Sequence, residues 1–203
     1  MPRIHPLSFA INVARNIPVR ISILRFRLRN RFSRASILSQ EGPTLSLTTH
    51  GHRLNDVFLA IESIARGTLK PSRLMLHLDV EEHVKNPLKT LQRLQARGLE
   101  IHLSENLGPH TKIQPWIVNA PTFSVPHVVA DDDILYPRWW LNRLRECFVS
   151  DSTSIHAYRA HRMVAAQDGM SMTAYESWPP GLGKPSNLNF ATCVSGVLFP
   201  PTF

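Results

Sequence analysis

Strand-like and helix-like segments alternate along most of this chain, and that alternation restricts its fold more than any other feature. Short apolar runs are followed by stretches in which apolar residues recur every three or four positions. We expect strands at 45–49, 73–78, 99–103, 126–130 and 154–158, and helices at 55–66, 87–97, 111–119 and 139–149. This order predicts an α/β fold with a mostly parallel sheet flanked by helices.

Length and composition narrow the class of protein. The 203 residues suit one domain with a sizeable core, and the hydrophobic content of 43% is that of a globular protein. The two cysteines, Cys147 and Cys193, form no metal-type cluster and are expected to be buried thiols in a reducing compartment. No apolar run approaches the length of a membrane span, and the basic start lacks a secretory signal pattern. We therefore expect a cytoplasmic location.

The net charge of +8 is unevenly distributed along the chain. Residues 1–36 contain eight arginines and no acidic residue, and the arginines alternate with apolar residues between Ile21 and Arg31. This spacing favours a strand or an irregular segment over a helix with one clean face. The segment could contact the inner face of a membrane, bind nucleic acid, or form a lead-in or docked helix with solvated arginines. No nucleic-acid motif accompanies it, so no nucleic-acid partner is expected. The turn-rich stretch 39–43 then separates a basic lead-in, 1–42, from a domain spanning 43–203.

Three consecutive carboxylates, Asp131, Asp132 and Asp133, end the apolar run 125–130. Like charges repel, so this cluster favours a bound cation, and Mg²⁺ is commonly held by one or two carboxylates plus substrate phosphates. Open α/β sheets bind their ligands outside the carboxyl ends of the strands. The pattern therefore predicts a site for a metal and a diphosphate, with a solvated acidic turn as the alternative.

The segment 128–141, VVADDDILYPRWWL, resembles the "DDDxxYP..WL" block of bacterial glycosyltransferases of the family 2-like group, which have a GT-A (Rossmann-like) fold. Further stretches resemble other blocks of that group in the expected order, namely 45–53, 61–76, 108–112, 175–178 and 196–201. The resemblance covers roughly residues 44–203. It implies a metal-dependent enzyme that moves a sugar from a nucleotide-diphosphate sugar to a glycan or cell-envelope acceptor.

The resemblance also implies a cofactor, a donor and roles for the aspartates. The cofactor would be Mn²⁺ or Mg²⁺, and the donor is expected to be a UDP-sugar. Asp131 would face the ribose or sugar and also the metal, and Asp133 would face the metal. Asp132 would either bind the donor or turn outward.

Other candidate donor-binding residues follow the first two strands or precede the aspartates. Lys112 could place a charge against phosphate, and Arg53 could pair with phosphate or form a surface ion pair. Asp79 could accept a hydrogen bond from a base or ribose, or belong to an acidic loop. Thr48 and His50 complete the set, because a doubly wound sheet receives its nucleotide beyond the first strand.

The catalytic base is not identified by a motif. In the related group an acidic block after the "PP" motif is expected to supply it, whereas this sequence ends at Phe203. We therefore expect a domain that is incomplete at its C-terminus, with Asp168 and Glu176 as weak base candidates. Incompleteness would leave Val197, Leu198 and Phe199 as an exposed apolar surface. The second function class is a non-catalytic module that binds a nucleotide-sugar or glycan.

Overall fold

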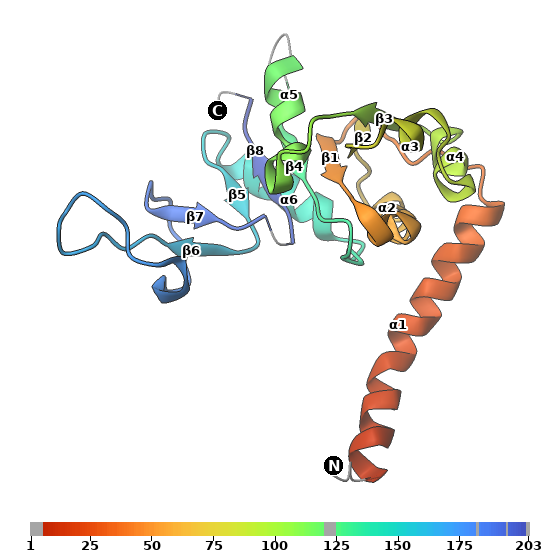
Figure 1. The fold of residues 1–203 in the computed structure, drawn as a ribbon, viewed down its shortest axis with the longest axis horizontal. Coiled ribbons are helices and arrows are strands. Elements are labelled where there is room, and N and C mark those ends of the chain that lie inside the picture. Colours follow the sequence, from red (N-terminus) through yellow and green to blue (C-terminus); the bar gives the residue numbers. More distant parts are fainter. Residues whose placement is uncertain (1–5, 120–124, 182, 194, 202–203) are drawn as a thin grey trace.

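A computed structural model describes residues 6–119, 125–181, 183–193 and 195–201, and its architecture is α/β (Figure 1). The six strands of the main sheet lie in the order β3 (Leu99–Leu103), β2 (Arg73–Leu78), β1 (Thr44–Thr48), β4 (His127–Val129), β8 (Val197–Phe199) and β5 (His156–Ala157). The helices are α1 (Pro6–Phe32), α2 (Val57–Ala65), α3 (Glu81–Lys85), α4 (Lys89–Gln95), α5 (Gln114–Asn119) and α6 (Trp140–Ser150). Three 3₁₀ turns are η1 (Gly51–Asn55), η2 (Gly108–Lys112) and η3 (Tyr175–Ser177).

The first four strands form the parallel part of the sheet, as the sequence predicts. β1 lies between β2 and β4 and runs parallel to both, with Ser46 opposite Met75 on one side and Val129 on the other. The chain moves outward from β1 to β2 and β3, then returns to place β4 on the other side of β1. The connections therefore reverse direction between β1 and β4, and the carboxyl ends of these two strands border the crevice where such sheets bind ligands.

The remaining strands were not fully predicted. β8 runs antiparallel to both β4 and β5 and lies between them, so Val197 and Leu198 are buried and Phe199 is partly buried. The expectation of an exposed apolar surface at these residues is therefore wrong. A strand that appears in the sequence as a short C-terminal run becomes an internal strand of the sheet, and its two neighbours cover it.

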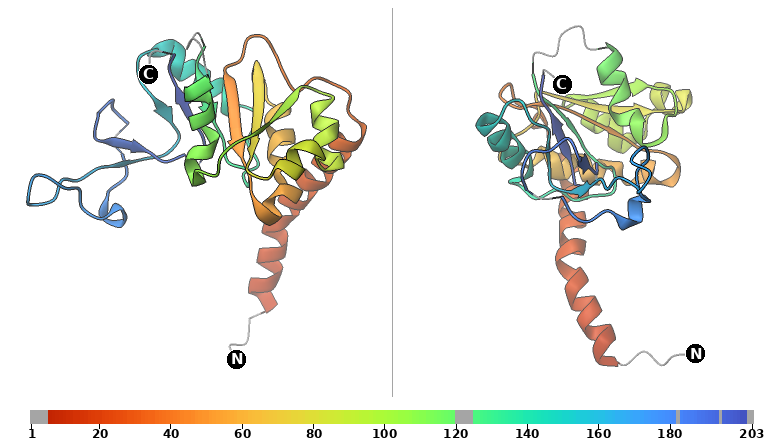
Figure 2. Two further views of the ribbon diagram at one scale, coloured as in Figure 1. Left: turned by 45° about the horizontal axis from the view of Figure 1, so that its top comes forward. Right: turned by 90° about the vertical axis from the view of Figure 1, so that its left-hand side faces the viewer.

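The basic segment is a long helix, which corrects the expectation of a strand or irregular structure. Its C-terminal half packs on the body, against α2 and α4, and the helix axis runs away from the sheet toward the N-terminus (Figures 1 and 2). Phe26 and Asn30 are buried at this contact, and Ile37 beyond the helix joins the core. A helix that packs on a protein core needs an apolar residue only every three or four positions. The alternating arginine and apolar pattern also places apolar residues at that spacing, so it is compatible with a helix.

The lead-in, 1–42, is therefore not a separate unit, because Phe26 and Ile37 within it belong to the same hydrophobic core as the domain. Arg3 and the other residues before position 6 lie outside the described part of the chain. Within the described part, no helix combines the length and the apolar character needed to span a membrane.

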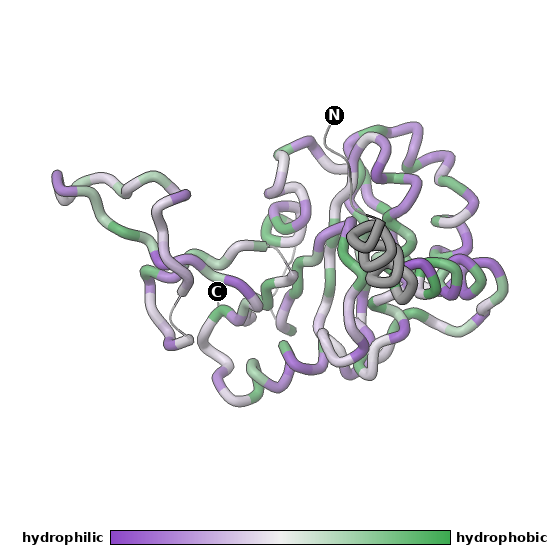
Figure 3. The backbone as a smooth tube through the Cα atoms, turned by 90° about the horizontal axis from the view of Figure 1, so that it is seen from below, coloured by the Kyte–Doolittle hydropathy of each residue, from purple (hydrophilic) through white to green (hydrophobic). Residues whose placement is uncertain are grey.

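A second, two-stranded sheet projects from the body and is formed by β6 (Ala160–Arg162) and β7 (Asn189–Ala191) (Figures 1 and 2). Tyr175, Trp178 and Phe190 contact one another there through their rings, with centroids 5.5–6.1 Å apart. This aromatic cluster gives the projection, residues 159–192, a small apolar centre of its own. The main apolar residues lie elsewhere, in the strands of the large sheet and in α2 (Figure 3).

Candidate functional site

A cavity of about 330 Å³ lies at the carboxyl ends of β1, β2 and β4. It is bordered by the residues that follow each of these strands and by the turn η2. Its lining consists of Thr48, Thr49, His50, Arg53, Asp79, Asn106, Gly108, Pro109, Thr111, Lys112, Ala130, Asp131 and Asp132. All seven residues expected to bind the donor therefore line this one cavity, namely Thr48, His50, Arg53, Asp79, Lys112, Asp131 and Asp132.

Lys112 and Asp131 form an ion pair at this cavity. The Lys112 Nζ lies 2.6 Å from Asp131 Oδ1, and the lysine side chain is only 7% exposed whereas that of Asp131 is 21% exposed. Lys112 ends the turn η2, which packs against β1, so its backbone is fixed next to the sheet. The ammonium thus lies on the same side of the sheet as the aspartates, where it could meet an anionic ligand.

Asp132 has a different environment from its two neighbours. It is buried, accepts a hydrogen bond of 2.5 Å from Thr49 Oγ1, and accepts a second of 3.1 Å from Arg53 Nη1. Asp132 therefore ties the loop after β4 to the loop after β1. The importance of Thr49 was missed from the sequence, because nothing in a lone threonine after a strand indicates its partner.

Asp133 points to solvent rather than into the cavity. Its side chain is 61% exposed, lies 3.7 Å from Arg53 Nη1, and is not part of the cavity lining. Of the two candidate metal ligands, only Asp131 lines the cavity. The Arg53 guanidinium lies between two carboxylates and remains 43% exposed, so it is accessible to a ligand.

Asp79 and His50 lie at the rim of the same cavity. Asn106 Nδ2 donates a hydrogen bond of 2.6 Å to Asp79 Oδ2, which leaves the other carboxylate oxygen for a ligand hydroxyl. His50 is exposed, and Thr48 donates through its hydroxyl to the carbonyl of His77 in β2. Thr48 therefore helps to fix the strand ends, while His50 is free to turn toward a bound molecule.

A fully buried histidine supports the site from beneath. His127 Nε2 and Nδ1 lie 2.8 Å from Ser46 Oγ and Thr44 Oγ1, and the Ser46 hydroxyl donates to the backbone carbonyl of Lys112. Because Ser46 donates its one proton to Lys112, it must accept from His127, which places the imidazole proton on Nε2. Burial lowers the pKa of His127 to about 3, with His77 and Arg73 adding to the effect, so the ring is neutral. This network holds the backbone of Lys112 against β1.

Tyr136 fixes the turn that carries the aspartates. Its hydroxyl accepts a hydrogen bond of 2.7 Å from the backbone N–H of Asp131, and its ring is buried against Trp140 at a centroid distance of 4.1 Å. Burial raises the pKa of this phenol, and the neighbouring carboxylates raise it further, so it stays protonated. The tyrosine of the "DDDxxYP" stretch is therefore a structural support.

Gly196 allows close packing beneath the same region. Its φ is +103°, and a Cβ there would lie 2.5 Å from the Trp140 ring. Only glycine fits this contact. The Trp140 indole N–H also donates a 2.6 Å hydrogen bond to the carbonyl of Ser195.

The two base candidates lie outside the cavity. Asp168 caps a turn in the projection and accepts hydrogen bonds from Ser171 and from the backbone N–H of Met170. These hydrogen bonds, the Ser171 side chain first, lower the pKa of Asp168, which makes it a weaker base. Glu176 is exposed in η3, and neither residue lines the cavity.

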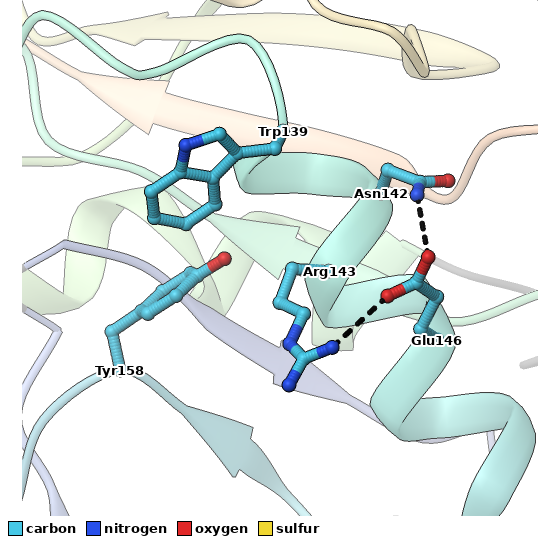
Figure 4. A pocket seen from close by; sticks show the side chains of 5 residues that line it. All are labelled: Trp139, Asn142, Arg143, Glu146 and Tyr158. Atoms are coloured by element: carbon cyan, nitrogen blue, oxygen red, sulfur yellow. Dashed lines mark hydrogen bonds and ion pairs between the residues drawn. The ribbon is translucent and has the colours of Figure 1, made fainter.

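A second hollow, of about 490 Å³, lies beside α6 (Figure 4). The rings of Trp139 and Tyr158 lie side by side there, with centroids 6.0 Å apart and planes tilted by 57°, and Glu146 accepts hydrogen bonds from Asn142 and Arg143. Trp139 is 56% exposed whereas Trp140 is buried, so only the second tryptophan belongs to the core. The single carboxylate here is already paired, which makes this hollow a poorer site for a phosphorylated ligand than the first.

Comparison with known proteins leaves the family open, because no protein-family model matches the chain and no curated protein matches it. The resemblance to glycosyltransferases therefore rests on the segment 128–141 and on the shorter stretches between residues 45 and 201.

Metal binding by protein groups alone is not supported. In the described residues no group of three or more His, Cys, Asp or Glu side chains is arranged to hold a metal ion. The oxygens of Asp131 and Asp133 are suitable donors for Mg²⁺ or Mn²⁺, but Asp131 is paired with Lys112. The residues fit a divalent cation only if a bound diphosphate supplies the other oxygens.

Proposed function

We propose that this protein is a glycosyltransferase of GT-A type that binds a nucleotide-diphosphate sugar, such as a UDP-sugar, in the cavity between β1 and β4. The observation that carries the proposal is the position of this cavity. It lies at the point where the connections of a parallel sheet reverse, and Lys112 and Arg53 border it beside Asp131 and Asp132.

Different residues of the cavity would bind different parts of the ligand, according to their charge. Lys112 and Arg53 would bind the diphosphate, because both are cations whose present partners are carboxylates that a phosphate can replace. The free oxygen of Asp79 and the ring of His50 would face the nucleoside at the ends of β1 and β2. Buried Asp132 would keep the two loops together during binding through the hydrogen bond that it accepts from Thr49.

A divalent cation fits the proposal as a partner of the diphosphate. Asp131 and Asp133 would hold Mn²⁺ or Mg²⁺ together with the phosphate oxygens. When bound, the cation would act as a Lewis acid that stabilises the leaving diphosphate. The acceptor would be a glycan or a cell-envelope component.

Nucleotide binding by variants tests the proposal. We expect UDP to raise the melting temperature in the presence of Mn²⁺, since a ligand that binds only the folded state stabilises it. Asp133→Asn should abolish the metal-dependent part of this shift without changing the melting temperature of the free protein, because its side chain is exposed. Asp56→Asn, at another exposed aspartate that does not line the cavity, is the control. Equal shifts for Asp133→Asn with Mn²⁺ and for the natural protein with chelator and without Mn²⁺ would show that the metal assignment is wrong.

A non-catalytic binding module is the second candidate, and the position of Asp168 and Glu176 favours it. Both lie on the projection, away from the cavity lining, so neither is placed to deprotonate an acceptor hydroxyl there. An assay of UDP-sugar hydrolysis and transfer distinguishes the two candidates. Metal-dependent binding without turnover would favour the module.

A further inference from the structure

The whole net charge of this protein belongs to its N-terminal segment. Residues 1–36 contain eight of the 23 basic residues and no acidic residue. The remaining 15 basic residues are equal in number to the 15 acidic residues, all of which follow position 40. The body is therefore neutral in sum, and the charge of +8 lies on the segment that contains α1.

One face of α1 is used to attach the helix to the body. Phe26 and Asn30 are buried on this face, and Ile23 packs against the core. Arg29 donates from Nε to buried Glu62 at 3.0 Å and from Nη2 to the carbonyl of Ala65 at 3.2 Å. These contacts fix the rotation of the helix about its axis, and so decide which side chains point outward.

The opposite face carries a stripe of exposed apolar side chains. Ile21, Leu24, Leu28 and Phe32 follow one another at spacings of three, four and four residues, which places them on a single face of a helix. Their exposed fractions are 45%, 59%, 49% and 67%. In Figure 3 the described turns of α1 alternate between hydrophobic and hydrophilic residues. Four neighbouring apolar side chains on a helix that leaves the body form a surface that needs a partner.

Arginines border the stripe on both sides. The helical period places exposed Arg20, Arg27 and Arg31 along one edge and exposed Arg25 along the other. On the body, the charge of Arg66 interacts with those of Arg25 and Arg29 of α1 and of Arg138, which adds positive charge near the helix. Apolar side chains between two rows of cations are typical of helices that lie in the plane of a membrane surface.

Two other partners fit this surface less well. A second copy of α1 would place arginines opposite arginines, with no acidic residue in 1–36 to pair with them. A nucleic acid would pair with the arginines but would leave the stripe exposed to water, because phosphate contacts do not use apolar side chains. An anionic lipid bilayer offers both phosphates and an apolar interior.

We propose that the outward face of α1 docks on an anionic lipid bilayer. Ile21, Leu24, Leu28 and Phe32 insert among the lipid headgroups, and the flanking arginines bind the lipid phosphates. The proposal does not depend on the activity of the cavity, since none of these residues lines it.

Vesicle sedimentation with the full chain tests the proposal. The protein should sediment with vesicles of phosphatidylcholine mixed with phosphatidylglycerol, not with phosphatidylcholine alone, and added salt should release it. Arg20→Gln with Arg27→Gln should weaken binding roughly fivefold for each arginine removed. Leu24→Gln with Leu28→Gln should weaken it by about tenfold or more through lost apolar insertion.

A matched double variant on α6 provides the control. Arg145→Gln with Val149→Gln removes one exposed arginine and one exposed apolar residue from another helix, and it should leave vesicle binding unchanged. All three double variants should keep the natural melting temperature, because the changed side chains are exposed. Equal binding to neutral and anionic vesicles, or equal losses in the α6 variant, would overturn the proposal. So would a duplex DNA or RNA that outcompetes anionic vesicles, or a stable dimer that the Leu24 and Leu28 changes dissociate.

Discussion

The carboxylate of Glu62 in α2 and those of Asp131 and Asp132 after β4 are all paired with cations, but they differ in what surrounds them. Glu62 is fully buried and accepts from Arg97 through both terminal nitrogens, from Arg29 and from Asn30. The aspartates pair with Lys112 and Arg53 at the edge of a cavity. The first cluster is closed to solvent, whereas the second is open on one side.

This difference separates a structural role from a binding role. Each carboxylate oxygen of Glu62 accepts two hydrogen bonds from donors within the protein, so neither oxygen is left to bind a ligand. At the cavity, a ligand phosphate can take the place of a carboxylate beside Lys112 or Arg53. An ion pair alone therefore does not indicate a binding site. Access to the paired groups from a cavity distinguishes a binding role from a structural one.

Glu62→Gln should have the largest effect on stability. It leaves the Arg97 side chain, which is 2% exposed, as a buried charge without a counterion, at an expected cost of about 3–5 kcal/mol in the free energy of unfolding. Urea denaturation measures it. The control is Glu100→Gln, which breaks the exposed pair with Arg73 and should cost less than about 1 kcal/mol. Equal losses in both variants would mean that the buried cluster is not structural.

Lys112→Ala should affect ligand binding more than stability. The partner Asp131 still reaches water, so the free energy of unfolding should fall less than in Glu62→Gln. Loss of a charged hydrogen bond to phosphate should weaken nucleotide diphosphate binding about tenfold to a hundredfold. Calorimetric titration with UDP and Mn²⁺ measures this change, with Lys85→Ala at an exposed lysine as the control. If Lys112→Ala unfolds the protein but Glu62→Gln does not, the roles of the two clusters are reversed.

A third effect concerns pH, and it tests whether the His127 network beneath the cavity is closed to solvent as the Glu62 cluster is. The pKa of His127 is about 3 in the folded chain, below its usual value of 6.5. Between these two pH values the unfolded chain therefore binds a proton at this residue that the folded chain does not bind. The free energy of unfolding should therefore decrease as the pH falls from 6 to 4, by up to about 1.4 kcal/mol per pH unit for this group.

Denaturation of the His127→Gln variant at pH 7 and pH 5 isolates this contribution. The variant should be less stable at pH 7 but lose less stability on acidification than the natural protein. Burial also lowers the pKa of His77, to about 4, and this residue contributes in both proteins, so only the difference reports on His127. An unchanged pH dependence would show that the His127 ring is not held neutral.

The resemblance and the strand pattern located much of the candidate site in advance. Lys112, Arg53 and Asp79 each follow or precede a predicted strand, and parallel strands bring such residues to one edge of a sheet. The choice among the three aspartates could not be made in this way. Asp132 turns inward because Thr49 and Arg53, more than 75 residues earlier in the chain, supply its hydrogen bonds.

By itself, the sequence determined the local elements and the charge of each segment. Its apolar periods specify β1 to β4 and the helices α2, α4, α5 and α6, because burial of one face is a local demand on spacing. Only the tertiary structure decided what depends on distant partners. It places β8 between β4 and β5 and buries it there, because strand pairing is set by neighbours far along the chain. It also makes α1 a helix whose outward face is apolar and basic, because Glu62 and the core select the side that docks.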